Sequence, residues 1–421
     1  MFCYNLLFVQ QYYRCYDRTQ FVDSNIPKLL RAAIQACKNA QGIGCFYRGG
    51  YCNGSWIKES ALFPSALAAS DFDEEEFEYI DEEVVFIGYM SDVWGHAITD
   101  CLKHLWWLRT DEYKEKHIGK KLIYWGPKTL SGNFLELVRL AGVDISKLYY
   151  IDRKIRYRSV IVPDLSFNYT EGWATKEYLD TIDLIVSNVK TYERKERKVF
   201  LSERETRRIY GIKTIEKVAR SAGYTVYYPG EHSLQDQISV IRSASHILSF
   251  ESSVGHNTIF CNSKTKVIMI RKADYPNVYQ QIINELRNLD CTTVNSSLSV
   301  MNDERYPYGG PFFVYPNELL CNLLMQTCDK KSKLLNSFRI LFPFKEFRDY
   351  IGYSSWCNEG LLAIRLLAKE EQLKVLAHEI VRYRESQIKK LNGLLKFVPL
   401  PSNLKERIVT KIAKYKVRRL V

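Results

Sequence analysis

The chain has 421 residues, 46% of them hydrophobic, and a formal net charge of +12. Its length exceeds the size at which one hydrophobic core keeps growing, so two domains are expected, and the apolar share is ordinary for a globular protein. No run reaches the ~20 apolar residues that a membrane-spanning helix needs, which predicts a soluble or peripheral protein.

The eleven cysteines are scattered and show neither a CxxC pair nor a metal-ligand spacing. An odd number of cysteines without a disulfide framework favours reduced thiols and a cytoplasmic protein. Residues 1–9 run directly into a polar stretch, so they resemble a first strand more than a signal peptide. The sequence therefore predicts a cytoplasmic location and no metal site.

The charge is distributed unevenly along the chain. Residues 71–83 are an acidic block (DFDEEEFEYIDEE), which we expect to be a solvated connection into the first clear strand. Residues 371–421 hold 13 Lys and Arg against 4 Glu, so most of the positive excess lies in the last eighth of the chain. This asymmetry indicates an acidic partner surface, either anionic lipid or nucleic acid.

The first half of the chain becomes regular in pattern only near residue 84. Residues 1–70 are irregular, with one expected helix at 27–39. Beyond them, short apolar runs predict strands that alternate with helices, and this alternation predicts a parallel sheet covered on both faces. The strands are expected at 84–89, 121–125, 147–151 and 159–163, and the helices at 96–109 (amphipathic) and 134–141.

A charged helix end separates this unit from a second one. Residues 175–197 are expected to form a helix that becomes highly charged at 193–198 (ERKERK), the best candidate for an interdomain linker. The second unit repeats the alternation of strands and helices. Its strands are expected at 199–202, 224–229, 246–250 and 266–270, and its helices at 212–222, 234–243 and 256–261.

The loop at 251–255 (ESSVG) joins the strand at 246–250 to the short helix at 256–261. Free backbone N–H groups and the helix dipole favour an anion at such a turn. Its small residues let a ligand approach the backbone, and Glu251 would accept hydrogen bonds from ribose hydroxyls. The alternative is a turn that binds nothing, with Glu251 stabilised by the helix dipole.

A second polar loop, at 91–95, follows the strand at 84–89. It places His96 and Asp100 one helical turn apart on one face. A carboxylate beside a histidine orients the ring and stabilises the imidazolium, so the pair is a candidate general base. The alternative is a histidine at a helix start that is satisfied by a backbone partner.

A third polar loop starts at Ser202 and carries Arg204, Arg207 and Arg208 at the carboxyl end of the second unit's first strand. Arginine side chains there suit bidentate phosphate binding. The alternative is a solvated face, since alternating charges are common at helix starts.

Taken together, two α/β units with these polar loops resemble the GT-B architecture of sugar transferases. More narrowly, Gly95-His96 followed by Asp100 and a Leu-rich segment resembles the N-terminal motif of glycosyltransferase family 61. The stretch 199–208 (VFLSERETRR) is similar to that family's strand ending in Ser-Arg with further arginines.

The second unit carries the rest of the resemblance. Residues 224–231 (YTVYYPGE), 234–244 and 251–257 are similar to the family's Pro-Glu turn, amphipathic helix and loop ending in Asn. The usual form of that loop is HGAGLTN, and only Asn257 is in place here, so the loop does not predict the donor or the handling of its phosphates. The resemblance covers roughly residues 80–290.

This resemblance implies an α/β, GT-B-like fold with two Rossmann-like domains facing a cleft. It also implies an inverting transferase that moves a sugar from a nucleotide-sugar donor to a growing glycan, typically in capsular or exopolysaccharide assembly. Helix N-termini and cationic side chains, rather than a metal, would stabilise the leaving diphosphate, and no cofactor is implied. His96 and Asp100 would be catalytic, and the donor would be bound by Ser202, Arg204, Arg208, Glu251, Ser252, Ser253, His256 and Asn257.

The expected organisation has three parts. Residues 1–190 would form the acceptor-side domain, 198–330 the donor-side domain, and 331–421 a helical basic extension. No nucleic acid is expected as a partner, because the extension has no recognition fold and its basic residues are interleaved with apolar ones.

Within the extension, residues 403–419 predict a basic amphipathic helix. Leu404, Ile408, Ile412 and Tyr415 recur at helical spacing, with Lys and Arg on the other faces. Such a helix suits an anionic membrane and would place the protein at the inner face of the plasma membrane, beside a lipid-linked glycan acceptor. The alternative is that the apolar stripe packs onto the body.

Two other functions remain open at this point. A polysaccharide pyruvyl transferase has a similar outline but would need an Arg beside His256, which the loop lacks. A catalytically degenerate protein that binds glycan or membrane is the other possibility.

Overall fold

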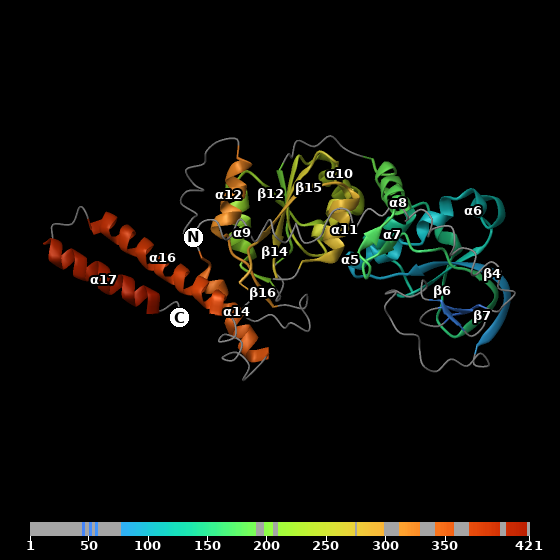
Figure 1. Ribbon diagram of the computed structural model, residues 1–421, viewed down its shortest axis with the longest axis horizontal. Coiled ribbons are helices and arrows are strands. Elements are labelled where there is room, and N and C mark those ends of the chain that lie inside the picture. The colour runs from blue at the N-terminus through green and yellow to red at the C-terminus, as the bar shows by residue number, and fades with distance from the viewer. Residues whose placement is uncertain are drawn as a thin grey trace.

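The computed structural model describes residues 44–46, 50–52, 55–57, 77–190, 198–204, 209–273, 276–298, 311–328, 342–357, 370–395 and 401–418. Within them the chain forms two main β-sheets flanked by helices, and both sheets contain parallel pairs. The expected mixed α/β class is therefore confirmed. Figure 1 shows the sheets side by side with helices at their junction. Those helices are α7 (Gly132–Leu140), α8 (Lys176–Ser187), α10 (Leu234–Ser243) and α11 (Val278–Leu286).

The first sheet has seven strands in the order β3-β2-β1-β7-β4-β5-β6. The long central strand β4 (Glu78–Tyr89) pairs in parallel with β5 (Lys121–Trp125) and with β7 (Ile155–Ile161). β6 (Leu148–Tyr150) continues the parallel part beside β5. These strands match the four predicted for this unit, with shifted ends.

The other edge of this sheet is antiparallel and was not predicted. β1 (Gly44–Phe46) pairs with β7 and with β2 (Gly50–Cys52), and β2 pairs with β3 (Ser55–Ile57). The prediction of an irregular 1–70 region is therefore wrong for these residues, because strands of three residues are too short to show a period of two. The helix predicted at 27–39 lies outside the described residues.

The acidic block also differs from its prediction. Residues 78–83 are exposed or half-buried, as expected, but they form the first half of β4 and not a connection. Opposite charges on neighbouring segments balance them: Glu78 lies 2.6 Å from Arg153, and Glu82 lies 2.7 Å from Lys121. Such cross-strand pairs let an acidic run extend a strand. Residues 71–76 lie outside the described part of the chain.

The single amphipathic helix predicted at 96–109 is wrong. The segment consists of three short pieces, α5 (Trp94–Ala97), η3 (Asp100–Leu102) and η4 (Leu105–Arg109). Thr99 interrupts the helix with φ −123° and ψ −82°, and its hydroxyl donates to the Gly95 carbonyl at 2.8 Å. Such side-chain-to-backbone bonds compete with the helix. Even Lys103 is buried, so the segment has no polar face.

The second sheet has five strands in the order β12-β10-β13-β14-β15, all parallel. Parallel strands are covered on both faces, which explains their near-continuous apolar sequences. β13 and α10 have the predicted ends, and the short helix expected at 256–261 is the 3-10 helix η7 (Gly255–Phe260). The strands are β12 (Thr225–Tyr227), β10 (Lys198–Leu201), β13 (His246–Phe250), β14 (Lys266–Arg271) and β15 (Asp290–Asn295).

Shorter elements complete the two units. The helix expected at 175–197 ends at Ser187, where Asn188 bonds the Leu140 carbonyl through its side chain. The linker proposed at 193–198 falls almost entirely on residues that the structure does not describe. The remaining elements are α6 (Asp111–Lys116), η5 (Ile145–Lys147), β8 (Phe167–Asn168), β9 (Trp173–Ala174), β11 (Ile209–Tyr210), α9 (Ile212–Ser221), η6 (Pro229–Glu231), β16 (Phe312–Phe313) and α12 (Glu318–Gln326).

One apolar cluster joins the two sheets. Phe200 and Leu248 face a separate core with α9 and α12 on the far side of the second sheet. Their neighbours Val199 and Ile247 face the opposite way, into a cluster that also contains Val85 of the first sheet. The two units therefore share a continuous hydrophobic contact, which disfavours free relative motion.

Three longer helices follow, α14 (Phe344–Cys357), α16 (Glu370–Leu395) and α17 (Ser402–Arg418). In Figure 1, α16 and α17 lie side by side as a hairpin that projects from the second sheet's side of the molecule. Leu404 and Ile412 are exposed on α17, whereas Val409 and Ala413 are buried. Among the helices that the structure describes, none is both long and apolar enough to cross a bilayer.

Candidate functional site

Two of the predicted polar loops meet at the junction of the two sheets. α5 follows the carboxyl end of β4, and residues 251–255 follow the carboxyl end of β13. Gly95 makes the meeting possible, because a Cβ atom on it would lie 2.8 Å from Ser253 Oγ and 3.4 Å from His256 Nδ1. Trp94 adds a hydrogen bond from its Nε1 to Asn257 Oδ1 at 2.9 Å. Residues more than 150 positions apart therefore form one cluster.

The His96–Asp100 contact expected from their spacing is present. His96 Nδ1 lies 2.8 Å from Asp100 Oδ2, although the helix between them is interrupted. Asp100 is 2% exposed and the His96 side chain is 31% exposed, so the carboxylate is buried behind an imidazole that reaches solvent. A buried carboxylate that holds a histidine ring is the arrangement a general base requires.

Tyr279, on α11, contacts both His96 and Asp100 and was not predicted from the sequence. Its hydroxyl donates to Asp100 Oδ2 at 3.1 Å. Its ring stacks on Tyr169 with centroids 4.8 Å apart and meets the His96 ring edge-on at 5.9 Å. Burial, and then the Asp100 charge, raise the pKa of Tyr279, so the hydroxyl remains a donor at neutral pH. α11 was not among the predicted helices, although Asn277 as an N-cap and the apolar residues Val278, Ile282 and Ile283 are a local signal for it.

His256 lies on η7, next to this cluster, and is 4% exposed. Neither ring nitrogen makes a hydrogen bond to any described residue, and the same holds for Asn257 Nδ2. Burial lowers the pKa of His256 to about 4, and the neighbouring Asn277 opposes this shift without reaching hydrogen-bond geometry. His256 is therefore a neutral imidazole. Buried polar atoms without partners are rare, and several together indicate a place for a ligand or ordered water.

The first residues of the 251–257 loop are engaged with the protein itself. Glu251 forms an ion pair with Arg271 at 3.0 Å, and burial raises the pKa of Glu251 while Arg271 opposes the shift. Ser252 Oγ donates to Glu203 Oε1. Ser253 is the exposed residue of this group.

Of the binding residues predicted on the arginine loop, Ser202 and Arg204 are the two that the structure describes, and both are paired outside the cluster. Arg204 pairs with Glu231, its Nη2 2.7 Å from Oε2, and its guanidinium lies 4.0 Å from the centre of the Tyr228 ring. Ser202 Oγ donates to Glu216 Oε1 at 2.9 Å. Arg207 and Arg208 lie outside the described residues. Glu203 is the loop's contact with Ser252, and no spacing rule had singled it out.

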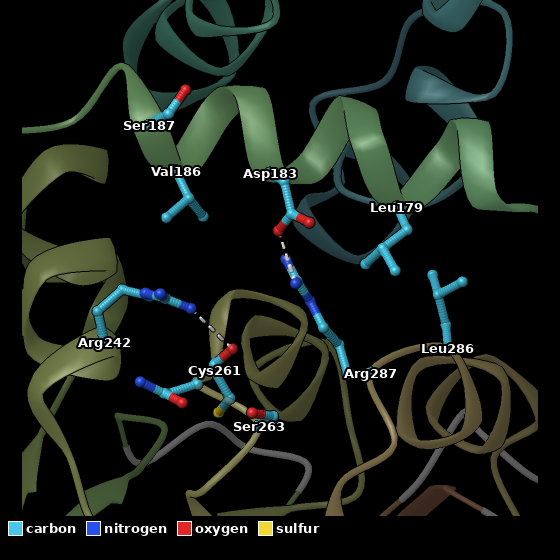
Figure 2. Close-up of a pocket in the computed structure, with 10 residues that line it drawn as sticks. Leu179, Asp183, Val186, Ser187, Arg242, Cys261, Ser263, Leu286 and Arg287 are labelled. Atoms are coloured by element: carbon cyan, nitrogen blue, oxygen red, sulfur yellow. Dashed lines mark hydrogen bonds and ion pairs between the residues drawn. The ribbon is translucent and has the colours of Figure 1, made fainter.

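The pocket in Figure 2 lies elsewhere, with a volume of about 600 Å³. Its walls come from α8, the ends of α10 and α11, and residues 261–263. Tyr279 lies near the start of α11 and Arg287 just beyond its end, so at 1.5 Å per residue about 12 Å of helix axis separates them.

Within the part of the chain that the structure describes, no three His, Cys, Asp or Glu side chains are gathered in a way that could hold a metal ion.

Comparison with known proteins identifies one family. The model described as Glycosyltransferase 61 matches residues 94–268, which begin at α5 and end in β14. This range includes His96, Asp100 and the whole 251–257 loop. A search of curated proteins gave no match. Residues 94–268 are therefore a glycosyltransferase family 61 region, and the assignment predicted from the sequence motifs is confirmed.

Proposed function

We propose that the protein is an inverting glycosyltransferase that moves a sugar from a nucleotide-sugar donor to a glycan acceptor in capsular or exopolysaccharide assembly. The family region supports glycosyltransferase activity. The observation that carries the proposal is the His96–Asp100–Tyr279 contact, which lies against the 251–257 loop near the carboxyl ends of parallel strands from both sheets. Ligands of α/β proteins bind outside these strand ends.

In the proposed mechanism His96 removes the proton of the acceptor hydroxyl. The hydroxyl oxygen then forms a bond to the anomeric carbon of the donor, and the bond from that carbon to the diphosphate oxygen breaks. Asp100 stabilises the imidazolium that forms and holds the ring in place through Nδ1. His96 suits this role because its side chain is partly exposed while Asp100 is buried.

The leaving diphosphate would be stabilised without a metal or cofactor. In our proposal the backbone N–H groups of Ser253 and Val254 and the polar side-chain atoms of His256 and Asn257 face the donor, because the Gly255 N–H already donates to the Ser252 carbonyl. His256 would act as a neutral donor of a hydrogen bond, since its pKa is about 4. Arg204 would join the phosphates by exchanging Glu231 for them, which its exposed position allows. Ser202, Arg208, Glu251 and Ser252 remain candidate residues for binding the nucleotide-sugar donor.

We also propose the GT-B organisation, with an acceptor-side domain of residues 1–190 and a donor-side domain of residues 198–330. The basic extension of residues 331–421 would rest on the anionic inner face of the plasma membrane, near a lipid-linked acceptor. Exposed Leu404 and Ile412 on α17, together with exposed Arg407 and Lys411, support this placement.

The experiment is to incubate the full chain with a panel of nucleotide sugars, select the donor by thermal stabilisation, and then measure turnover. His96→Ala should reduce kcat about 10²–10⁴-fold and leave donor stabilisation unchanged. His378→Ala is the control, because His378 is an exposed histidine on α16.

Two results would contradict the proposal. If His96→Ala unfolds the protein, the pair is structural. If no nucleotide sugar stabilises the chain or turns over, a degenerate binding role replaces the enzyme.

A further inference from the structure

We propose that the pocket between α8 and the end of α11 is a second ligand site, for a small molecule that carries a phosphate group. It is separate from the proposed donor site. The donor loop leaves the carboxyl end of β13, whereas residues 261–263 of the pocket wall lead into the amino end of β14. Because β13 and β14 are parallel, the two sites lie at opposite ends of the strands of the same sheet.

The charge of the pocket favours an anion. Arg242 and Arg287 approach from opposite walls, and Asp183 is the single acidic residue among the lining side chains (Figure 2). Two guanidinium groups on different helices can share the oxygens of one phosphate, because those oxygens point in several directions. A carboxylate offers only one such edge, so phosphate suits two arginines better.

The guanidinium group of Arg287 has one nitrogen that lacks a hydrogen-bond partner among the described residues. Its Nε donates to the Ile259 carbonyl at 2.5 Å and its Nη1 contacts Asp183 Oδ1 at 2.6 Å. The remaining nitrogen, Nη2, is buried without a partner among the described residues, and the whole side chain is only 10% exposed. A buried cationic donor without an acceptor is costly, so an additional anionic oxygen would stabilise it.

Asp183 already presents a carboxylate to Arg287 from the pocket side. Its side chain is 52% exposed, so it can turn toward solvent when another anion takes its place. Arg242 has a comparable freedom, since its one hydrogen bond within the described part of the chain runs from Nη1 to the Cys261 carbonyl at 3.1 Å. Both arginines can therefore adjust around a phosphate without breaking the core.

The other lining residues indicate which chemical groups would fit beside the phosphate. Leu179 and Val186 of α8 and Leu286 of α11 are apolar, and Asn262 and Ser263 add polar groups. A volume of about 600 Å³ is within the range of small-molecule sites. The pocket thus suits a phosphate attached to a compact body with an apolar face, such as a sugar ring or a nucleoside.

Because the walls come from both units, a bound ligand would bridge them. α8 belongs with the first sheet, and α10 and α11 cover the second. α11 also carries Tyr279, which bonds Asp100, so the ligand would hold one end of the helix whose other end reaches the proposed base.

The test measures binding of inorganic phosphate and of glucose 1-phosphate to the full chain by calorimetry, with acetate as the carboxylate probe. We expect saturable binding of both phosphates and none of acetate. Arg242→Gln should weaken phosphate binding about tenfold or more. Asp183→Asn should strengthen it about tenfold, because the variant removes a competing negative charge a few ångströms away.

Matched controls separate this site from the donor site. Asp180→Asn lies one turn earlier on α8, pairs with Lys176 and should change nothing. His96→Ala should also leave phosphate binding unchanged. Phosphate binding at this pocket can therefore be measured even if the proposed glycosyltransferase function is wrong. The proposal is overturned if neither the native chain nor Asp183→Asn binds phosphate saturably. It is equally overturned if His96→Ala or Arg204→Ala abolishes the binding while Arg242→Gln does not, since the phosphate would then occupy the donor site.

Discussion

At the scale of single residues, the centre of the proposed site is a carboxylate held by groups from both sheets. The Asp100 carboxylate is hydrogen-bonded to His96 of its own segment and to Tyr279 of α11, which lies 179 positions away. The tyrosine is thus a positioning residue, because it acts on the base through Asp100. Its stacking on Tyr169 holds the ring where the hydroxyl can reach the carboxylate.

Tyr279→Phe removes this hydroxyl and keeps the ring stack. We expect kcat to fall roughly 10- to 100-fold, the value of a hydrogen bond to a charged group, with KM for the donor unchanged. Steady-state kinetics on the selected donor checks this. Tyr79→Phe is the control, since it removes an exposed tyrosine–carboxylate bond to Asp81 far from the site. An equal loss in both variants, or a rise in KM alone, would show that Tyr279 does not position the base.

His256 gives a second residue-scale prediction, which concerns pH. Burial lowers its pKa to about 4 in the folded state, against 6.5 for an ordinary histidine. Between these values the unfolded chain binds the proton and the folded chain does not, so stability is complete above about pH 6.5 and is lost as the pH falls toward 4. The contribution from this residue should fall by about 2 kcal/mol between pH 7 and pH 5.

Urea unfolding of the native chain and of His256→Asn at both pH values measures this difference. Other titrating groups are common to the two proteins, so the extra loss in the native chain belongs to His256. His378→Ala, at an exposed histidine, should retain the native pH dependence. Parallel loss in the native chain and in His256→Asn would mean that His256 is protonated in the fold.

At the scale of elements, the buried and exposed residues of α17 differ from those predicted from its sequence. Leu404 and Ile412 were expected to share one apolar stripe with Ile408 and Tyr415. The structure leaves Leu404 and Ile412 exposed, buries Val409 and Ala413, and does not describe the Tyr415 side chain. The hairpin with α16 therefore covers only part of the apolar surface, and exposed apolar and basic residues remain on the same helix.

From this surface we expect the full chain to sediment with anionic phospholipid vesicles at low salt, and a truncation at Leu391 to remain in the supernatant. Each basic residue near an anionic leaflet contributes on the order of 1 kcal/mol. The pair Arg407→Glu and Lys411→Glu should therefore weaken vesicle binding by about 30-fold or more. Lys264→Glu together with Lys266→Glu, at exposed positions by the start of β14, is the charge-matched control. If neither the full chain nor the truncation sediments, the hairpin is structural and the membrane proposal fails.

At the scale of the whole molecule, the shared apolar cluster contains residues of both sheets, so we expect the two sheets to unfold together. Ile259, fully buried on η7, belongs to that cluster, and η7 packs against α8. Ile259→Ala should lower the free energy of unfolding by about 2–5 kcal/mol, as for other buried large-to-small changes.

Because the cluster spans both units, we expect this variant to unfold in one transition by circular dichroism and by intrinsic fluorescence. Ile118→Ala, at an isoleucine that is 54% exposed, should change stability little. Two separate transitions in Ile259→Ala, one of them unchanged, would show that the units fold independently.

The sequence by itself determined the α/β class, the family of residues 94–268 and most elements of the second sheet. Buried parallel strands leave continuous apolar runs such as 246–250, so this signal is local. It also determined that His96 and Asp100 meet, because four residues of spacing keep them together even across the break at Thr99.

Only the tertiary structure decided which distant groups surround that pair. Gly95 against Ser253, Trp94 on Asn257 and Tyr279 on Asp100 are contacts across the junction of two sheets, and no local pattern encodes them. The same holds for the strand formed by residues 78–83, whose backbone pairs with β7 although its side chains stay exposed or half-buried. Local propensity depends on neighbours along the chain, whereas these outcomes depend on charges and volumes that meet only when the chain is folded.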